Sequence, residues 1–280
     1  MKMSALNILG VLAMKELRDG LRNRWIAAAI IVLGTLALAL SLLGSAPTGS
    51  IKASAMDISI ISLASLSVYL IPLIALMLSF DALVGEFERG TMMLLLTYPV
   101  TRWQVIMGKF LGHVLILFIA IFAGYGGAML ILIMFTDASI EGWQAYLSMM
   151  TSSLILGAVF IALGYLVSVM VKERATAAGT AIGLWLVFVV LYDLILFGAL
   201  LADEGQLIGQ QLFSMLMLVS PTDTYRILNL SMFDGVSQAA GIAGVASEAG
   251  MSSTLLVSVL MLWIVAPLIA TLLVFQRREL

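Results

Sequence analysis

Few residues of this 280-residue chain could carry out catalysis, and their types narrow the possible chemistry. The chain has one histidine, His113, and no cysteine. Disulfides, thiolate metal sites, a cysteine nucleophile and a cage of several histidines are therefore excluded. The sequence also contains no Gly-Lys-Ser/Thr loop to cradle phosphates, so the chain is not expected to hydrolyse ATP itself. We expect no catalytic residue, metal or cofactor in this chain.

Asp193 is the one acidic residue in the middle of a long apolar stretch. A carboxylate at membrane depth is costly and normally faces a partner, water or a pathway. It could make a polar contact at a dimer seam or cavity. Alternatively, the apolar stretch ends earlier and Asp193 lies near the outer interface beside Tyr192. Both interpretations remain open.

His113 and the methionines have structural explanations. A lone histidine one turn inside an apolar stretch is expected to be a packing or interface residue, because no further ligands lie nearby in the sequence. The 18 methionines could offer soft ligands to Cu(I), but they are scattered. They are expected to be apolar filler.

Two classes of membrane protein would need more ionisable groups. An intramembrane protease needs a nucleophile with a base, or paired aspartates, whereas Asp193 and His113 lie on different apolar stretches. A secondary transporter driven by an ion gradient needs several buried ionisable groups, and only Asp193 qualifies. Ion-gradient-driven transport is kept as an alternative function for this chain.

The composition is that of an integral membrane protein. Hydrophobic residues make up 62% of the chain and charged residues 11%, against about 45–50% and about 25% in soluble domains. The net charge is -2 and no basic stripe is present, so no nucleic-acid partner is expected.

Six apolar stretches are long enough to cross a bilayer as helices, for which about 20 residues are needed. The first begins only at Trp25, after a polar segment, so it is expected to be a retained span rather than a signal peptide. We therefore predict an all-α protein with one transmembrane domain and six spans. The spans are residues 25–44, 58–80, 110–135, 146–171, 177–201 and 253–275.

The basic residues predict the orientation of these spans. All but Lys52 and Arg226 of the 14 lysines and arginines fall on one side of the predicted spans. The positive-inside rule makes that side cytoplasmic and places both termini there. Residues 1–24 form a cytoplasmic amphipathic N-terminal helix, 81–109 a cytoplasmic loop, and 202–252 the larger external loop. We expect a multi-pass protein of a bacterial inner membrane.

The external loop contains a possible docking motif. Its first half is apolar enough to lie on or dip into the membrane, Ser220-Pro221 stops that helix, and Gly235–Gly250 is rich in small residues. Turn chemistry, with an Asx-type turn at Asp223, accounts for the segment that follows. The other interpretation is a docking site for an external partner. Its residues would be Pro221, Thr222, Asp223, Tyr225 and Arg226.

The cytoplasmic loop contains a helix too short to cross the membrane. Thr91–Tyr98 would span about 12 Å as a helix. Pro99 ends it, because proline disfavours helix at the preceding residue. Thr101 and Gln104 then match a capping box from which a new helix runs into the third span.

This short helix could rest on lipid headgroups or dock a cytoplasmic protein. Apolar anchors ringed by charges fit either surface, so periodicity does not decide. The anchors would be Met92, Leu95 and Leu96, and the charges Glu86, Glu88, Arg89 and Arg102.

The loop resembles the first cytoplasmic loop of ABC-2 type permeases. The matching residues are Glu86, Gly90-Thr91, Leu94-Leu95-Leu96, Pro99-Val100-Thr101-Arg102 and Gly108-Lys109. Lys15–Trp25 is also similar to the amphipathic N-terminal helix of that family. The resemblance extends to span number, orientation and length.

The resemblance implies a non-catalytic subunit. In that family the short helix is a coupling helix that docks on a cytoplasmic ATPase, and the ATPase binds ATP and Mg²⁺. The resemblance also implies a homodimer. Lys172, Glu173 and Arg174 would form a second, smaller ATPase contact, or simply a positive-inside anchor.

Two further stretches narrow the resemblance within the family. Ser62–Glu86 and Ser220–Asn229 look like permeases that serve the maturation of nitrous oxide reductase. That resemblance implies a periplasmic solenoid partner at Pro221–Arg226 and an indirect link to a copper chaperone. The cargo could be a sulfur species, copper or nothing.

Overall fold

The computed structural model describes residues 5–22, 24–44, 55–135, 142–203, 209–230 and 251–278. Within these ranges the regular structure is helical and no strand is present. Gly235–Gly250, the small-residue half of the predicted external loop, lies outside the described residues. The predicted all-α class is confirmed.

Five helical segments are long and apolar enough to cross a membrane, and they match the last five predicted spans. They are α3 (Ala55–Ser79) continuing into α4 (Val84–Glu88), α6 (Arg102–Phe135), α7 (Trp143–Met170), α8 (Arg174–Leu186) continuing into α9 (Tyr192–Asp203), and α13 (Ser253–Arg277). The first predicted span corresponds to α2 (Arg24–Gly44), which contains a shorter apolar segment, Ala27–Leu40. Six spans therefore remain a prediction.

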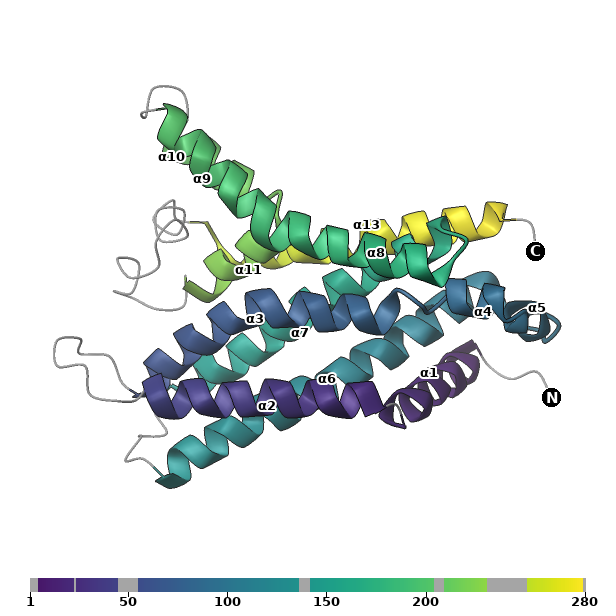
Figure 1. Cartoon of the computed structure of the whole chain (residues 1–280), viewed down its shortest axis with the longest axis horizontal. Coiled ribbons are helices and arrows are strands. Elements are labelled where there is room, and N and C mark those ends of the chain that lie inside the picture. Colours follow the sequence, from purple (N-terminus) through teal and green to yellow (C-terminus); the bar gives the residue numbers. More distant parts are fainter. Residues whose placement is uncertain are drawn as a thin grey trace.

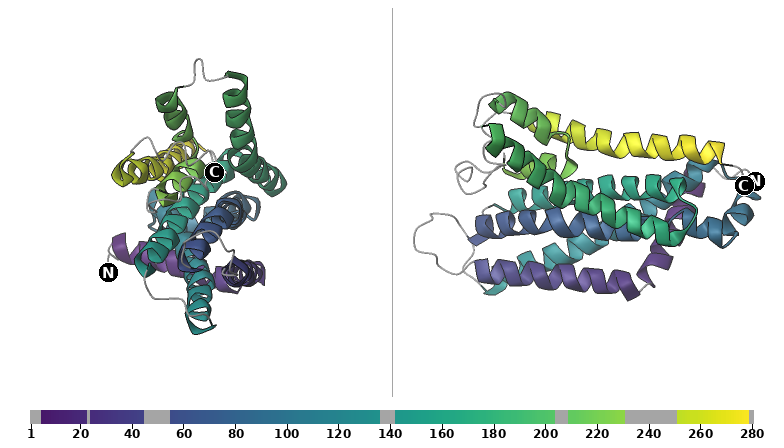
Figure 2. Two further views of the ribbon diagram at one scale, coloured as in Figure 1. Left: turned by 90° about the vertical axis from the view of Figure 1, so that its left-hand side faces the viewer. Right: turned by 45° about the horizontal axis from the view of Figure 1, so that its top comes forward.

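Helix α7 is the centre of the bundle. Of its most apolar stretch, 78% of the residues are buried, against 11% for α8–α9 and 17% for α13. It packs against α3, α6, α13 and α11 (Pro221–Leu230). Figures 1 and 2 show α2, α3 and α6 on one side of it and α8, α9 and α13 on the other.

The two ends of the bundle differ in what they carry. Both termini lie at one end, together with α1 (Ala5–Leu21), α4 and α5 (Thr91–Leu96), which we call the terminal end (Figure 1). The opposite end carries α10 (Gln210–Met217) and α11. This arrangement agrees with the prediction that both termini lie on the same side of the membrane.

Helix α11 corrects one prediction. The helix ending before Ser220-Pro221 is present, since α10 stops at Met217. The Asx-type turn at Asp223 is wrong, because Asp223 lies in the first turn of α11. Pro221 is the first residue of that helix, where its missing N–H leaves no lost hydrogen bond.

Two glycines on α6 let α1 approach closely. A Cβ added at Gly108 would lie 2.6 Å from Leu12 Cβ. At Gly112 it would lie 2.6 Å from Glu16 Cβ and 2.8 Å from the carbonyl oxygen of Ala13. Small residues four apart are a usual means of bringing two helices together in membrane proteins. The pair therefore sets the position of α1, and with it Glu16.

We predict that Gly112→Ala destabilises the protein by about 1–3 kcal/mol, because the backbone carbonyl of Ala13 cannot move aside without shifting α1. The measurement is the thermal unfolding midpoint in detergent. Gly127→Ala on the same helix is the control, since nothing lies within 4 Å of its added Cβ. Equal midpoints for the two variants would contradict close packing of α1 on α6.

Candidate functional site

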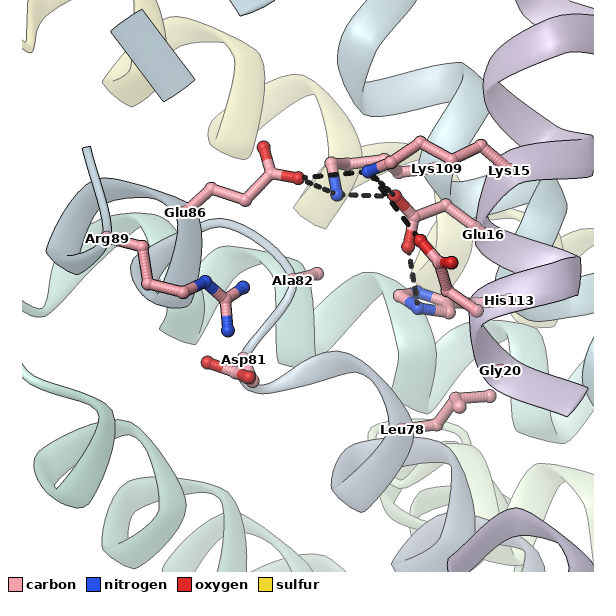
Figure 3. A pocket seen from close by; sticks show the side chains of 11 residues that line it. Lys15, Glu16, Gly20, Leu78, Asp81, Ala82, Glu86, Arg89, Lys109 and His113 are labelled. Atoms are coloured by element: carbon pink, nitrogen blue, oxygen red, sulfur yellow. Dashed lines mark hydrogen bonds and ion pairs between the residues drawn. The ribbon is translucent and has the colours of Figure 1, made fainter. Parts of the chain in front are cut away.

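A buried lysine joins three elements at the terminal end. Lys109 of α6 has a side chain that is 3% exposed. Its Nζ donates to Glu16 Oε1 of α1 at 2.7 Å and lies 2.8 Å from Glu86 Oε1 of α4 (Figure 3). A buried charge is tolerated only when it is paired, so Lys109 requires both carboxylates. We call Lys109, Glu16 and Glu86 the buried charge cluster.

Other polar groups extend this cluster. Lys15 Nζ lies 3.5 Å from Glu86 Oε1, and His113 Nε2 lies 3.8 Å from Glu16 Oε2. His113 Nδ1 shares a hydrogen bond of 2.9 Å with the hydroxyl of Tyr165 on α7. His113 is thus a packing residue within a hydrogen-bonded network, as predicted, and this network reaches the central helix.

The environment of Glu16 favours its charged form. Burial alone would raise the pKa of Glu16, but Lys109, His113 and Lys15 together outweigh burial, so the net pKa lies below the ordinary value. Glu16 is therefore ionised at neutral pH. The carboxylate of Glu16 is consequently a permanent partner of Lys109.

A pocket of about 280 Å³ opens beside the cluster, between α1, α3, α4 and α6 (Figure 3). Lys15, Glu16, Glu86, Lys109 and His113 line it, together with Asp81 and Arg89. Glu86 Oε2 and Asp81 Oδ1 are buried without a hydrogen-bond partner in the described part of the chain. Water or a shift of α4 could satisfy these oxygens.

The short helix of the predicted cytoplasmic loop is present as α5. Gly90 precedes it with φ of 69°, a left-handed conformation that favours glycine. The predicted capping box is confirmed in part, because the backbone N–H of Thr101 donates to Gln104 Oε1 at 2.9 Å. Helix α6 then starts at Arg102.

The exposed apolar residues of α5 differ from the predicted anchors. Met92 is fully buried in the chain's own core, and Leu95 and Leu96 pack partly against it. The apolar surface is formed instead by Met93, Leu94 and Tyr98, at 57%, 66% and 67% exposure. We call these three residues the α5 surface. A six-residue helix that packs on a core buries one face, and the sequence did not predict which face of α5 that would be.

Three of the predicted rim charges, Glu86, Glu88 and Arg102, are also engaged within the chain. Glu86 belongs to the buried charge cluster. Arg102 donates to the carbonyl oxygens of Phe275 and Gln276 at the end of α13, the latter at 2.7 Å. Glu88 and Arg89 are exposed and directly precede Gly90 and α5, although Glu88 Oε1 also accepts from the backbone N–H of Arg174.

The end of α13 supports α4 from the other side. Phe87 of α4 packs edge-on against Phe275, with ring centroids 5.8 Å apart. The guanidinium of Arg278 lies 4.1 Å from the centroid of Phe87. Helix α4 is therefore held between the buried charge cluster and the last turn of α13.

Lys172-Glu173-Arg174, the predicted smaller ATPase contact, borders the same region. Arg174 Nη2 pairs with Asp81 Oδ2 at 2.6 Å, and its backbone N–H donates to Glu88 Oε1 at 2.7 Å. Lys172 and Glu173 are exposed. Arg174 thus connects the start of α8 to the segment that carries α4.

Asp193 has a charged partner at the opposite end. Its Oδ2 lies 2.5 Å from Arg226 Nη1, which also lies 2.9 Å from Asp223 Oδ1. Asp193 follows a π-helical segment, η1 (Val187–Leu191), and the carbonyl of Phe188 in that segment accepts from Thr222 Oγ1 at 2.9 Å. Such π segments are common at functional sites. The partner of Asp193 is thus α11 of the same chain.

Most of the predicted external docking residues are buried. Pro221, Thr222, Asp223 and Tyr225 have almost no exposed surface, and Arg226 is only partly exposed. Tyr225 shares a hydrogen bond of 2.8 Å with Ser153 of α7. These residues fasten α11 into the bundle, so they are not a free surface in this conformation.

Burial and the nearby Asp193 together raise the pKa of Asp223 to about 7, against the lowering effect of Arg226. Asp223 Oδ2 is buried without a hydrogen-bond partner in the described residues. One guanidinium therefore faces two carboxylates, and the raised pKa belongs to the more buried of them, Asp223. No group of three or more potential metal ligands occurs in the described part of the chain.

Comparison with known proteins agrees with this architecture. The family model for the ABC-2 family transporter protein matches residues 11–280. A probable ABC transporter permease protein NosY of Stutzerimonas stutzeri is 42% identical over 269 residues, covering 95% of this chain and 97% of the relative. The NosY of Pseudomonas aeruginosa is 43% identical over 274 residues, covering 97% of this chain and 98% of the relative.

The chain therefore belongs to the ABC-2 family and is a multi-pass, membrane-spanning permease subunit of an ABC transporter rather than a catalytic one. More narrowly, it is similar over nearly its whole length to permeases named NosY. The resemblance inferred from the sequence motifs is confirmed.

Sequence reasoning missed the centre of the site. Lys109 and Glu16 were not chosen as site residues, although a lysine beside the Gly108-x-x-x-Gly112 pattern was a usable signal. The pattern predicts a helix pressed against that face of α6. Any acidic residue on the approaching helix would then be a partner for Lys109.

We predict that Lys109→Met costs about 3–5 kcal/mol of stability, because it leaves Glu16 and Glu86 buried without their main partner. Unfolding in a denaturing detergent such as SDS measures this loss. Adding Glu86→Gln to Lys109→Met should recover part of it. The exposed Lys172→Met serves as a control, and an equal effect of both lysine variants would exclude the buried charge cluster as a stabilising element.

We predict that the stability contribution of Asp223 falls as pH rises. Its carboxyl has an ordinary pKa of about 3.9 when unfolded and about 7 when folded, so the folded state binds the extra proton between these values. That stabilisation is complete below about pH 4 and is lost through pH 7. The unfolding midpoint of wild type should therefore drop relative to Asp223→Asn between pH 5 and pH 8. Parallel pH curves for wild type and Asp223→Asn would refute this.

Proposed function

We propose that this chain is the membrane subunit of an ATP-driven complex in which a separate cytoplasmic ATPase docks on the α5 surface. The observation that carries the proposal is the exposure of Met93, Leu94 and Tyr98 beside Glu88 and Arg89. Large apolar side chains bordered by charge form a typical docking surface. The lack of a phosphate-binding loop is why the nucleotide and Mg²⁺ are assigned to the partner.

The route from the ATPase to the membrane would run through α4. Glu86 of α4 is ion-paired with Lys109 of α6, and Lys109 with Glu16 of α1. A displacement of α5 would move α4, and breaking the pair would leave a buried charge, so α1 and α6 are expected to follow. Nucleotide binding would thereby bias the packing of the spans, as a ligand does when it favours one of two states.

A second copy of the chain would complete the transporter. Only 11% of the α8–α9 stretch and 17% of the α13 stretch are buried within one chain. These helices offer surface to lipid and to another copy. Under this proposal the protein has six spans in a bacterial inner membrane, with both termini in the cytoplasm and α10–α11 on the periplasmic side.

The full-length similarity to NosY permeases supports a more specific role. In that role a NosF-like ATPase would drive the complex and a NosD-like periplasmic solenoid would bind near α11, with Arg226 as the part of the motif that is accessible. The complex would serve copper-site assembly in nitrous oxide reductase during denitrification, with a copper chaperone acting indirectly. It would export a sulfur species or copper, or do mechanical work on the periplasmic partners.

One observation favours the alternative of ion-gradient-driven transport. The Asp193–Arg226–Asp223 group can bind a proton near neutral pH. However, Arg226 neutralises one carboxylate, and the hydrogen bonds of Thr222 and Tyr225 fix α11 in place. A structural role for this group is therefore the simpler explanation, and transport that requires ATP rather than a pH gradient would separate the two functions.

We predict that Leu94→Asp abolishes co-purification of the ATPase with the detergent-solubilised chain, because it places a charge at the centre of an apolar contact. Val219→Asp, an exposed apolar residue between α10 and α11, should retain the ATPase. Retention of the ATPase by Leu94→Asp, or its loss from both variants, would contradict docking on α5.

A further inference from the structure

A second pocket lies at the terminal end, where α7 and α13 finish side by side. It encloses about 300 Å³. Its lining consists of Val169, Met170, Lys172, Val274, Arg277 and Arg278. Three of these six residues are cationic and none is acidic. Both helices are membrane-spanning candidates that end here, so the pocket lies at the boundary of the apolar layer.

One of the three cations is already used by the protein. Arg278 donates from Nη1 to the carbonyl oxygen of Val169 at 2.9 Å, near the end of α7. This contact satisfies a carbonyl that the helix end leaves free. Burial lowers the pKa of Arg278, but not enough to discharge a guanidinium.

The other two cations, Lys172 and Arg277, make no comparable contact within the described part of the protein. Lys172 and Arg277 make no hydrogen bond or ion pair with any described residue, and both side chains are exposed. An excess of positive charge at helix C-termini is ordinary. However, Lys172 and Arg277, unpaired among the described residues, are two cations that line one cavity together with apolar residues. Such a cavity favours a ligand that carries negative charge.

We propose that this pocket binds the phosphate of an anionic phospholipid. The three cations line the cavity, and Val169, Met170 and Val274 supply an apolar lining where the glycerol and first acyl carbons would lie. Met170 is 66% exposed in the isolated chain, as expected of a residue covered by lipid. Basic pockets between spanning helices on the cytoplasmic side are typical sites for anionic headgroups.

A lipid here would also steady the docking segment. Arg278 lies over Phe87 of α4, which packs on Phe275 of α13. Balancing the charge of Arg277 and Lys172 lowers their repulsion of Arg278 and favours its place over Phe87. The lipid site needs only the span boundary and the three cations, so it does not depend on the identity of the ATPase.

The test is native mass spectrometry of the full-length chain in detergent, titrated with phosphatidylglycerol or with phosphatidylcholine. Wild type should prefer phosphatidylglycerol. Lys172→Gln/Arg277→Gln should weaken that binding about thirtyfold, and Lys172→Gln alone about fivefold. The single variant changes one exposed loop residue and guards against misfolding of the double variant. Arg18→Gln/Arg22→Gln removes one exposed cation from α1 and one directly after it, and should leave binding unchanged.

Three results would overturn the proposal. One is equal binding of both lipids by wild type. Another is an equal loss of phosphatidylglycerol binding in the α1 control, which would indicate general surface charge. The third is displacement of the lipid by inorganic phosphate at matched concentration, which would indicate a site for a free anion.

Discussion

A single buried lysine determines how the terminal end of this permease is built. Lys109 is 3% exposed, and a lone ammonium in that position would be prohibitively costly. One partner, Glu16, is on α1 and lies 93 residues away in sequence. The other, Glu86, is on α4. The charge therefore requires α1, α4 and α6 to meet. Gly108 and Gly112 make the meeting possible by allowing α1 to approach α6 closely.

The two ends of the bundle use polar groups in different ways. At the terminal end, positive and negative charges are shared among three elements, and the adjoining α5 surface is left exposed. At the opposite end, α11 is held by Asp193, by the π segment and by a hydrogen bond that Tyr225 shares with Ser153 of the central helix. Helix α7 contributes Tyr165 to the first network and Ser153 to the second. This gives the most buried helix a contact with both ends.

The sequence predicted the helical class and five of the spans, because apolar runs of more than 20 residues have few alternatives. The capping interaction at Thr101 was also predictable, since it depends on residues only three apart. The face that α5 turns inward was not, because a six-residue helix has no usable periodicity. Neither was the burial of α11, whose polar residues Thr222 and Tyr225 find their partners on other helices. Local sequence patterns predict where helices form. Contacts between residues far apart in the sequence decide which side chains of those helices stay exposed.

The measurement that tests this account most directly is site-specific cross-linking in native membranes. The chain has no cysteine, so single introduced cysteines have no background. Leu94→Cys on the α5 surface should cross-link to the ATPase subunit, whereas the similarly apolar and exposed Leu212→Cys on α10 should not. Cross-linking from Leu212→Cys, or none from Leu94→Cys in a complex that contains the ATPase, would contradict the assignment of α5 as the docking helix.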